Sequence, residues 1–129
     1  MTTLAFYRTV IDETGQTNRA AVKQGVAAVL AALRDRLTPD EARQAAAQLP
    51  RELKTVWLAG EIAGRKPVKM HRRGFYERVK KDARLKSIPE ARLLVIAVFA
   101  ALKDQLSPGE VEDVQSQLPK DLKEIWEDA

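Results

Sequence analysis

The chain reads Gln48-Leu49-Pro50-Arg51-Glu52-Leu53-Lys54-Thr55-Val56-Trp57 and, 69 residues later, Gln117-Leu118-Pro119-Lys120-Asp121-Leu122-Lys123-Glu124-Ile125-Trp126. Each copy predicts a short helix, because proline is favoured at a helix start and the apolar residues that follow share one helical face. The same shift of 69 gives 19 identities among the 55 positions that pair residues 6–60 with residues 75–129. The chain therefore contains an internal repeat of two related units.

The repeat defines the organisation of the chain. We expect a single all-helical (all-α) domain over residues 1–129, built from a first unit at 1–60, a linker at 61–69 and a second unit at 70–129. A chain of 129 residues is long enough to form one core without disulfides, and it has no cysteine. We expect four helices per unit and a pseudo-twofold relation between the two units, which pack into one helical bundle.

Local signals predict where these helices begin. Thr2 or Thr3 is expected to cap a first helix that ends near Glu13, and Asn18 and Ser87 are expected to begin the second helix of each unit. The third helices begin at two matching turns, in which an N-cap, a proline and a glutamate follow in the capping-box order. These turns are Thr38-Pro39-Asp40-Glu41 and Ser107-Pro108-Gly109-Glu110.

The second helices of the two units differ in character. Leu93, Leu94 and Ile96 stand where the first unit has Gln24, Gly25 and Ala27, so we expect the helix of the second unit to be the more buried. The first unit has small residues there, mostly alanine. They suit close helix packing inside the chain or, as an alternative, a dimer face.

The doubled Leu-Pro-x-x-Leu-Lys-x-x-Trp motif, with the Thr/Ser-Pro-x-Glu turns and Phe75-Tyr76-x-x-Val79, resembles a bacterial family called domain of unknown function 2267. The resemblance covers essentially the whole chain. It implies a small, cytoplasmic, all-helical protein with a duplicated core. It assigns no catalytic residue to this chain.

Charge is distributed unevenly along the chain. The net charge is only +4, but residues 65–86 hold ten basic and two acidic residues, whereas residues 104–129 hold eight acidic and two basic residues. Most of these cations have no basic counterpart in the first unit, so the repeated architecture does not require them. The candidate contacts to an anion or a nucleic acid are Arg65, Lys66, Lys69, Arg72, Arg73, Lys80, Lys81, Arg84 and Lys86.

Three interpretations of the basic stretch remain open from the sequence. It pairs with the acidic C-terminal segment, within one chain or between subunits. It is a solvated face without a role. It binds nucleic acid or another anionic surface, although no helix-turn-helix or RNA-recognition signature accompanies it.

Signatures of catalysis and of cofactor binding are absent from the sequence. His71 is the only histidine, cationic neighbours surround it, and there is no cysteine, so we expect no metal site. Asp35 and Asp104 recur at matching positions, and a structural role for both is expected. No phosphate-binding glycine loop, nucleophile elbow or small-molecule site is apparent. The sequence thus predicts no catalytic residue, no cofactor and no enzymatic activity.

The sequence contains no run of apolar residues long enough to span a membrane and no recognisable signal peptide, so a cytoplasmic location is expected. The function expected first is a non-enzymatic protein-interaction or scaffold module that binds a protein partner or forms a homodimer. The alternative is binding of nucleic acid, without sequence specificity, or of an anionic surface through Arg65–Lys86.

Overall fold

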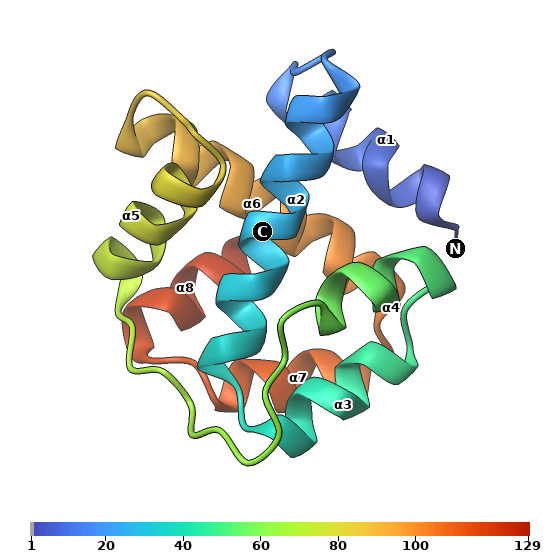
Figure 1. Ribbon diagram of the computed structural model, residues 1–129, viewed down its shortest axis with the longest axis vertical. Coiled ribbons are helices and arrows are strands. Elements are labelled where there is room, and N and C mark those ends of the chain that lie inside the picture. Colours follow the sequence, from blue (N-terminus) through green and yellow to red (C-terminus); the bar gives the residue numbers. More distant parts are fainter. Residues whose placement is uncertain (1) are drawn as a thin grey trace.

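The computed structural model describes residues 2–129, which form eight α-helices and no strand (Figure 1). The all-helical prediction is confirmed. In chain order the helices are α1 (Thr3–Thr14), α2 (Arg19–Arg36), α3 (Pro39–Ala47), α4 (Arg51–Leu58), α5 (Arg72–Asp82), α6 (Ile88–Gln105), α7 (Pro108–Ser116) and α8 (Lys120–Asp128).

The helix boundaries follow the repeat. Helices α2 and α6 have 18 residues each, α3 and α7 have nine each, and both pairs begin and end 69 residues apart. The predicted N-caps are also in place. The side-chain oxygens of Thr2, Asn18 and Ser87 accept hydrogen bonds from backbone N–H groups in the first turns of α1, α2 and α6.

The two units share one core. Helix α1 packs mainly along α6, whereas α5 packs against both α2 and α6, and α3 lies beside α7. Figure 1 shows α2 crossing the middle of the molecule, with α5 on one side and the α3–α7 pair below it. A single cluster of buried apolar residues takes members from all eight helices. None of the described helices is long and apolar enough to cross a membrane.

The prediction that α6 is more buried than α2 is wrong. Nine residues of α2 are buried and eight of α6. Leu93 is 46% exposed, so only part of the extra apolar surface of α6 faces the core. Leu94 is buried over Gly25, where an added Cβ would come within 2.9 Å of the leucine Cδ2 atom. Glycine at position 25 therefore lets α2 and α6 approach each other, as the packing interpretation of the small residues predicted.

Candidate functional site

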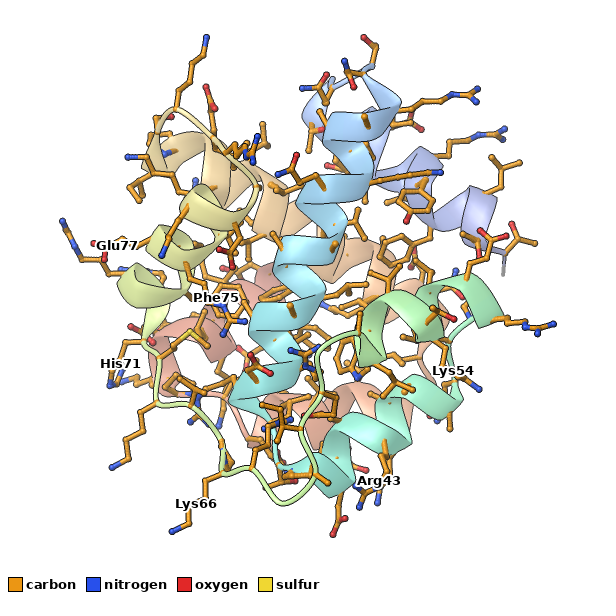
Figure 2. The ribbon with its side chains drawn as sticks, in the orientation of Figure 1. Arg43, Lys54, Lys66, His71, Phe75 and Glu77 are labelled. Atoms are coloured by element: carbon orange, nitrogen blue, oxygen red, sulfur yellow. The ribbon has the colours of Figure 1, made fainter. Side chains whose placement is uncertain are left out.

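The basic stretch lies along one outer edge of the molecule. Figure 2 shows Lys66, His71 and Glu77 pointing outwards along this edge, while Phe75 points inwards. Helix α5 buries Phe75, Tyr76 and Val79 against the core and turns its polar side to solvent. Lys80 is half-buried, and seven of the nine candidate cations are exposed: Lys66, Lys69, Arg72, Arg73, Lys81, Arg84 and Lys86. We call this surface, including Lys80, the α5 basic face.

Arg65 does not belong to this face, so its place among the anion contacts is wrong. Its guanidinium donates to the carbonyl oxygens of Arg34 and Leu37, both at 2.7 Å, and also bonds Glu61. The last carbonyls of a helix lack partners inside it, and a cation there also interacts favourably with the negative end of the helix dipole. Arg65 is thus a side-chain cap for the end of α2. Its hydrogen bond to Glu61 holds the pKa of that carboxyl below its usual value.

Arg78 is half-buried and is held by ion pairs rather than free on the surface. Its Nη2 atom lies 2.7 Å from Oδ2 of Asp35, and Arg34 bonds the other oxygen of the same carboxylate. Burial acts to raise the pKa of Asp35, but the hydrogen bonds from Arg78 and Arg34 prevail and lower it. Asp35 therefore joins α5 to α2. Asp104, at the matching position, is exposed and makes no ion pair among the described residues.

A shallow hollow lies on the α5 basic face. It has a volume of about 510 Å³, and four of the candidate cations surround it with one acid and two apolar residues. Its lining consists of Arg73, Lys80, Lys81, Arg84, Glu77, Leu85 and Ile88. Arg73 and Glu77 form an exposed ion pair at 3.0 Å, and this is the only ion pair among the lining residues of the hollow in the described chain. The hollow consequently keeps a positive balance.

Arg84 adopts a backbone conformation that favours glycine. Its φ is 55°, and it ends α5 with two bonds, from its own N–H to the Lys81 carbonyl and from the Leu85 N–H to the Lys80 carbonyl. This is the Schellman ending of a helix. Gly15, at the matching position of the first unit, has φ 71°. An arginine here costs on the order of 1 kcal/mol relative to glycine, and such outliers are frequent at functional sites.

The acidic C-terminal segment leaves the α5 basic face largely unpaired. Only His71 approaches one of its acids, with Nδ1 at 3.7 Å from Oδ1 of Asp121, and Asp121 also accepts from the Arg72 N–H. No lysine or arginine side chain of residues 65–86 forms an ion pair with an acid of residues 104–129, all of which the structure describes. Pairing of the two segments within one chain is therefore wrong as an explanation of the basic stretch.

The repeated tryptophans are core residues. Trp57 and Trp126 are 1% and 0% exposed, and their indole N–H groups donate to the carbonyls of Ala42 and Val111. Neither side chain is available as an anchor for a partner.

The two capping-box glutamates do not complete their boxes. Their own N–H groups bond the Thr38 and Ser107 hydroxyls as predicted. The N–H groups of these N-cap residues, however, bond glutamines from the other unit. Gln117 Oε1 accepts from Thr38 at 2.9 Å, and Gln48 Oε1 accepts from Ser107 at 2.7 Å.

The glutamate carboxyls are instead turned towards each other. Glu41 and Glu110 are both buried, and carboxylate oxygens of these two residues and of Asp113 lie within 4.8 Å of one another. Burial, followed by the nearby Glu110 and Asp113 carboxyls, raises the pKa of Glu41 to about 8. Sequence reasoning missed this cluster because each glutamate already had a local explanation. The signal that points to it is the identity of Glu41 and Glu110 at matching repeat positions, at the start of two helices that pack together.

Comparison with known families agrees with the resemblance seen in the sequence. The model of a family described as an uncharacterized conserved protein, DUF2267, matches residues 3–125. No curated protein matches the chain significantly. Because the family match spans nearly all of the chain, this protein belongs to the DUF2267 family.

Proposed function

We propose that the protein is a non-enzymatic binding module that contacts the phosphates of nucleic acid, without sequence specificity, through the α5 basic face. The observation that carries the proposal is the set of exposed cations along α5 and its flanking loops without acidic partners from the C-terminal segment. Unpaired cations gathered on one face are the electrostatic footprint of a phosphate-binding surface.

The same surface favours the backbone of a duplex over the bases of a single strand. Proteins that bind single strands place aromatic side chains where bases stack on them. The aromatic residues of α5, Phe75 and Tyr76, are 0% and 4% exposed. The α5 basic face therefore offers charge without a stacking platform, which suits contacts to phosphates.

Arg84 adds support from a second direction. The positive φ at this position favours glycine, which the first unit has. The second unit instead has a long cationic side chain there, which lines the basic hollow. A residue that costs stability at an exposed position fits a role outside folding.

The proposal is tested by fluorescence anisotropy with a labelled DNA duplex of about 20 base pairs. We expect affinity to fall steeply between 50 and 200 mM salt. The variant Lys80→Gln/Lys81→Gln/Arg84→Gln should weaken binding at least tenfold and reduce the log–log salt slope by about 2 to 3. The matched control removes three exposed cations from α1 and α2: Arg8→Gln, Arg19→Gln and Lys23→Gln. Equal losses in the two variants, or no binding at micromolar protein in low salt, would contradict the proposal.

A second candidate function is self-association as a scaffold. Six acidic residues of the C-terminal segment, residues 104–129, are exposed: Asp104, Glu112, Asp113, Glu124, Glu127 and Asp128. They form no ion pairs within the described chain, so they are available to the α5 basic face of a second copy. Such a homodimer should weaken with salt. Sedimentation at low and high salt measures this, and an invariant monomer would exclude it.

We also propose that the two four-helix units are related by a pseudo-twofold axis. The reciprocal glutamine bonds support this, since each unit caps the third helix of the other. The ends of α4 and α8 are also held by matching cations. Arg34 donates to the Trp57 carbonyl at the end of α4, and Lys103 donates to the Trp126 carbonyl at the end of α8.

A further inference from the structure

Two buried carboxyl groups meet where α3 packs against α7. Glu41 is 7% exposed and Glu110 is 6% exposed. The Oε1 atom of each is shielded from water, and no hydrogen-bond donor of the described residues reaches it. Buried polar atoms normally have a partner, so each orphaned oxygen requires an explanation.

The chain supplies no cation to these oxygens. None of the ion pairs formed among residues 2–129 includes Glu41 or Glu110. The capping role that would occupy the carboxylates is taken by Gln48 and Gln117 from the opposite units. Burial of unpaired carboxylates is unfavourable unless something compensates their charge.

We propose that Glu41, Glu110 and Asp113 bind one divalent cation. Each offers an oxygen, and these oxygens lie within 4.8 Å of one another, so they are no farther apart than two metal–oxygen bonds of about 2.4 Å can span. Asp113 lies one helical turn after Glu110 and is exposed, so it links the buried pair to solvent. An ion at this position would compensate the charge of the two buried carboxylates.

The donor set indicates the class of ion. All three ligands are carboxylates, and no histidine or cysteine accompanies them. Oxygen ligands of this kind suit the hard cations Mg²⁺, Ca²⁺ and Mn²⁺, whereas structural zinc sites use cysteine and histidine. The sequence-based expectation of no metal site considered ions that bind histidine and cysteine, such as zinc. The site proposed here binds a hard cation through carboxylates alone.

Mn²⁺ provides a direct probe, because electron paramagnetic resonance measures the free ion. In protein stripped with a chelator and then dialysed, we expect one Mn²⁺ bound per chain, displaced by excess Ca²⁺ or Mg²⁺. Asp113→Asn should weaken Mn²⁺ binding at least tenfold, since even the loss of a group that only orients a metal ligand costs about 10- to 100-fold in affinity. Asp113 is exposed, so this variant is expected to fold.

Glu112→Gln is the matched control, since it removes an exposed acid from the same helix without touching the cluster. It should bind Mn²⁺ as the unmodified protein does. Equal affinities in Asp113→Asn and Glu112→Gln would show non-specific attraction and overturn the proposal. It is equally overturned if no Mn²⁺ binds at millimolar concentration, in which case a shared proton compensates the pair.

Discussion

The side chain of Gln117 bonds Thr38 twice, because its Oε1 accepts from the Thr38 N–H at 2.9 Å and its Nε2 donates to the Thr38 hydroxyl at 3.3 Å. The two residues are 79 positions apart and belong to different units. Gln48 makes the same pair of bonds to Ser107. The hydroxyl caps of α3 and α7 are local, but the glutamine bonds to these N-cap residues form only when both units are in place. These bonds couple the stability of one unit to that of the other.

Gln117→Ala should lower the free energy of unfolding by about 1 to 2 kcal/mol, because it leaves a partly buried N–H without its acceptor. Urea denaturation measures this. Gln44→Ala is the control, since Gln44 is exposed and makes no side-chain hydrogen bond in the described structure, and its effect should stay within about 0.5 kcal/mol. Equal effects of the two substitutions would show that the inter-unit cap contributes nothing.

Arg84 and Gly15 permit an exchange experiment at matching positions. Arg84→Gly should raise the free energy of unfolding by about 0.5 to 1 kcal/mol, since it relieves a left-handed residue at the end of α5. Gly15→Ala should lower it by about 1 kcal/mol for the same reason. No heavy atom lies within 4 Å of a Cβ placed at Gly15, so only the backbone contributes. A loss of stability in Arg84→Gly, seen in thermal unfolding, would contradict this account.

The fold was predictable because its signals are local. The N-cap at Asn18, the proline of each third helix and the apolar spacing up to Trp57 each act within a few residues, and the repeat states them twice. The relative burial of α2 and α6 was not predictable in this way, since it depends on Leu94 packing over Gly25 across the units.

The site was only partly predictable, for a related reason. Arg65 and Lys66 are adjacent cations in the same loop, and composition does not distinguish them. Arg65 reaches the end of α2 and becomes internal, whereas Lys66 stays exposed. The glutamates show the same limit. The capping box correctly accounts for their backbone bonds, but the glutamine that displaces each carboxylate comes from the opposite unit.

The contrast between these neighbours gives a further prediction. Arg65→Ala should lower the free energy of unfolding by about 1.5 to 3 kcal/mol, because hydrogen bonds from a charged donor to the last carbonyls of α2 are lost. Lys66→Ala should change it by less than about 0.5 kcal/mol, as for most exposed positions. In the anisotropy assay Lys66→Ala should weaken duplex binding more than Arg65→Ala does, since Lys66 lies on the α5 basic face and Arg65 does not. Weaker duplex binding by Arg65→Ala than by Lys66→Ala, in protein that remains folded, would argue against this division of roles.

The buried glutamate pair should make stability fall as pH rises, in protein kept free of divalent cations by a chelator. The pKa of Glu41 is raised from 4.5 to about 8 in the folded state, first by burial and then by Glu110. Between these values the folded chain holds a proton that the unfolded chain has released. The stability that the protonated Glu41 contributes is therefore fully present below pH 4.5 and is lost as pH rises towards 8. The free energy of unfolding should fall by at most about 1.4 kcal/mol per pH unit. Asp35 and Glu61, with lowered pKa values, act in the opposite direction at acid pH.

Comparison with Glu41→Gln isolates the effect of the pair, because the carboxyls outside the Glu41–Glu110–Asp113 cluster contribute equally to both proteins. Gln at position 41 carries no charge at any pH, so Glu110 no longer faces a second carboxylate. Urea denaturation at pH 5, 6, 7 and 8 should show the stability of Glu41→Gln relative to the unmodified protein increasing with each step. Parallel pH profiles would mean that Glu41 titrates in the folded protein as it does in the unfolded chain, and that the two carboxyls do not interact.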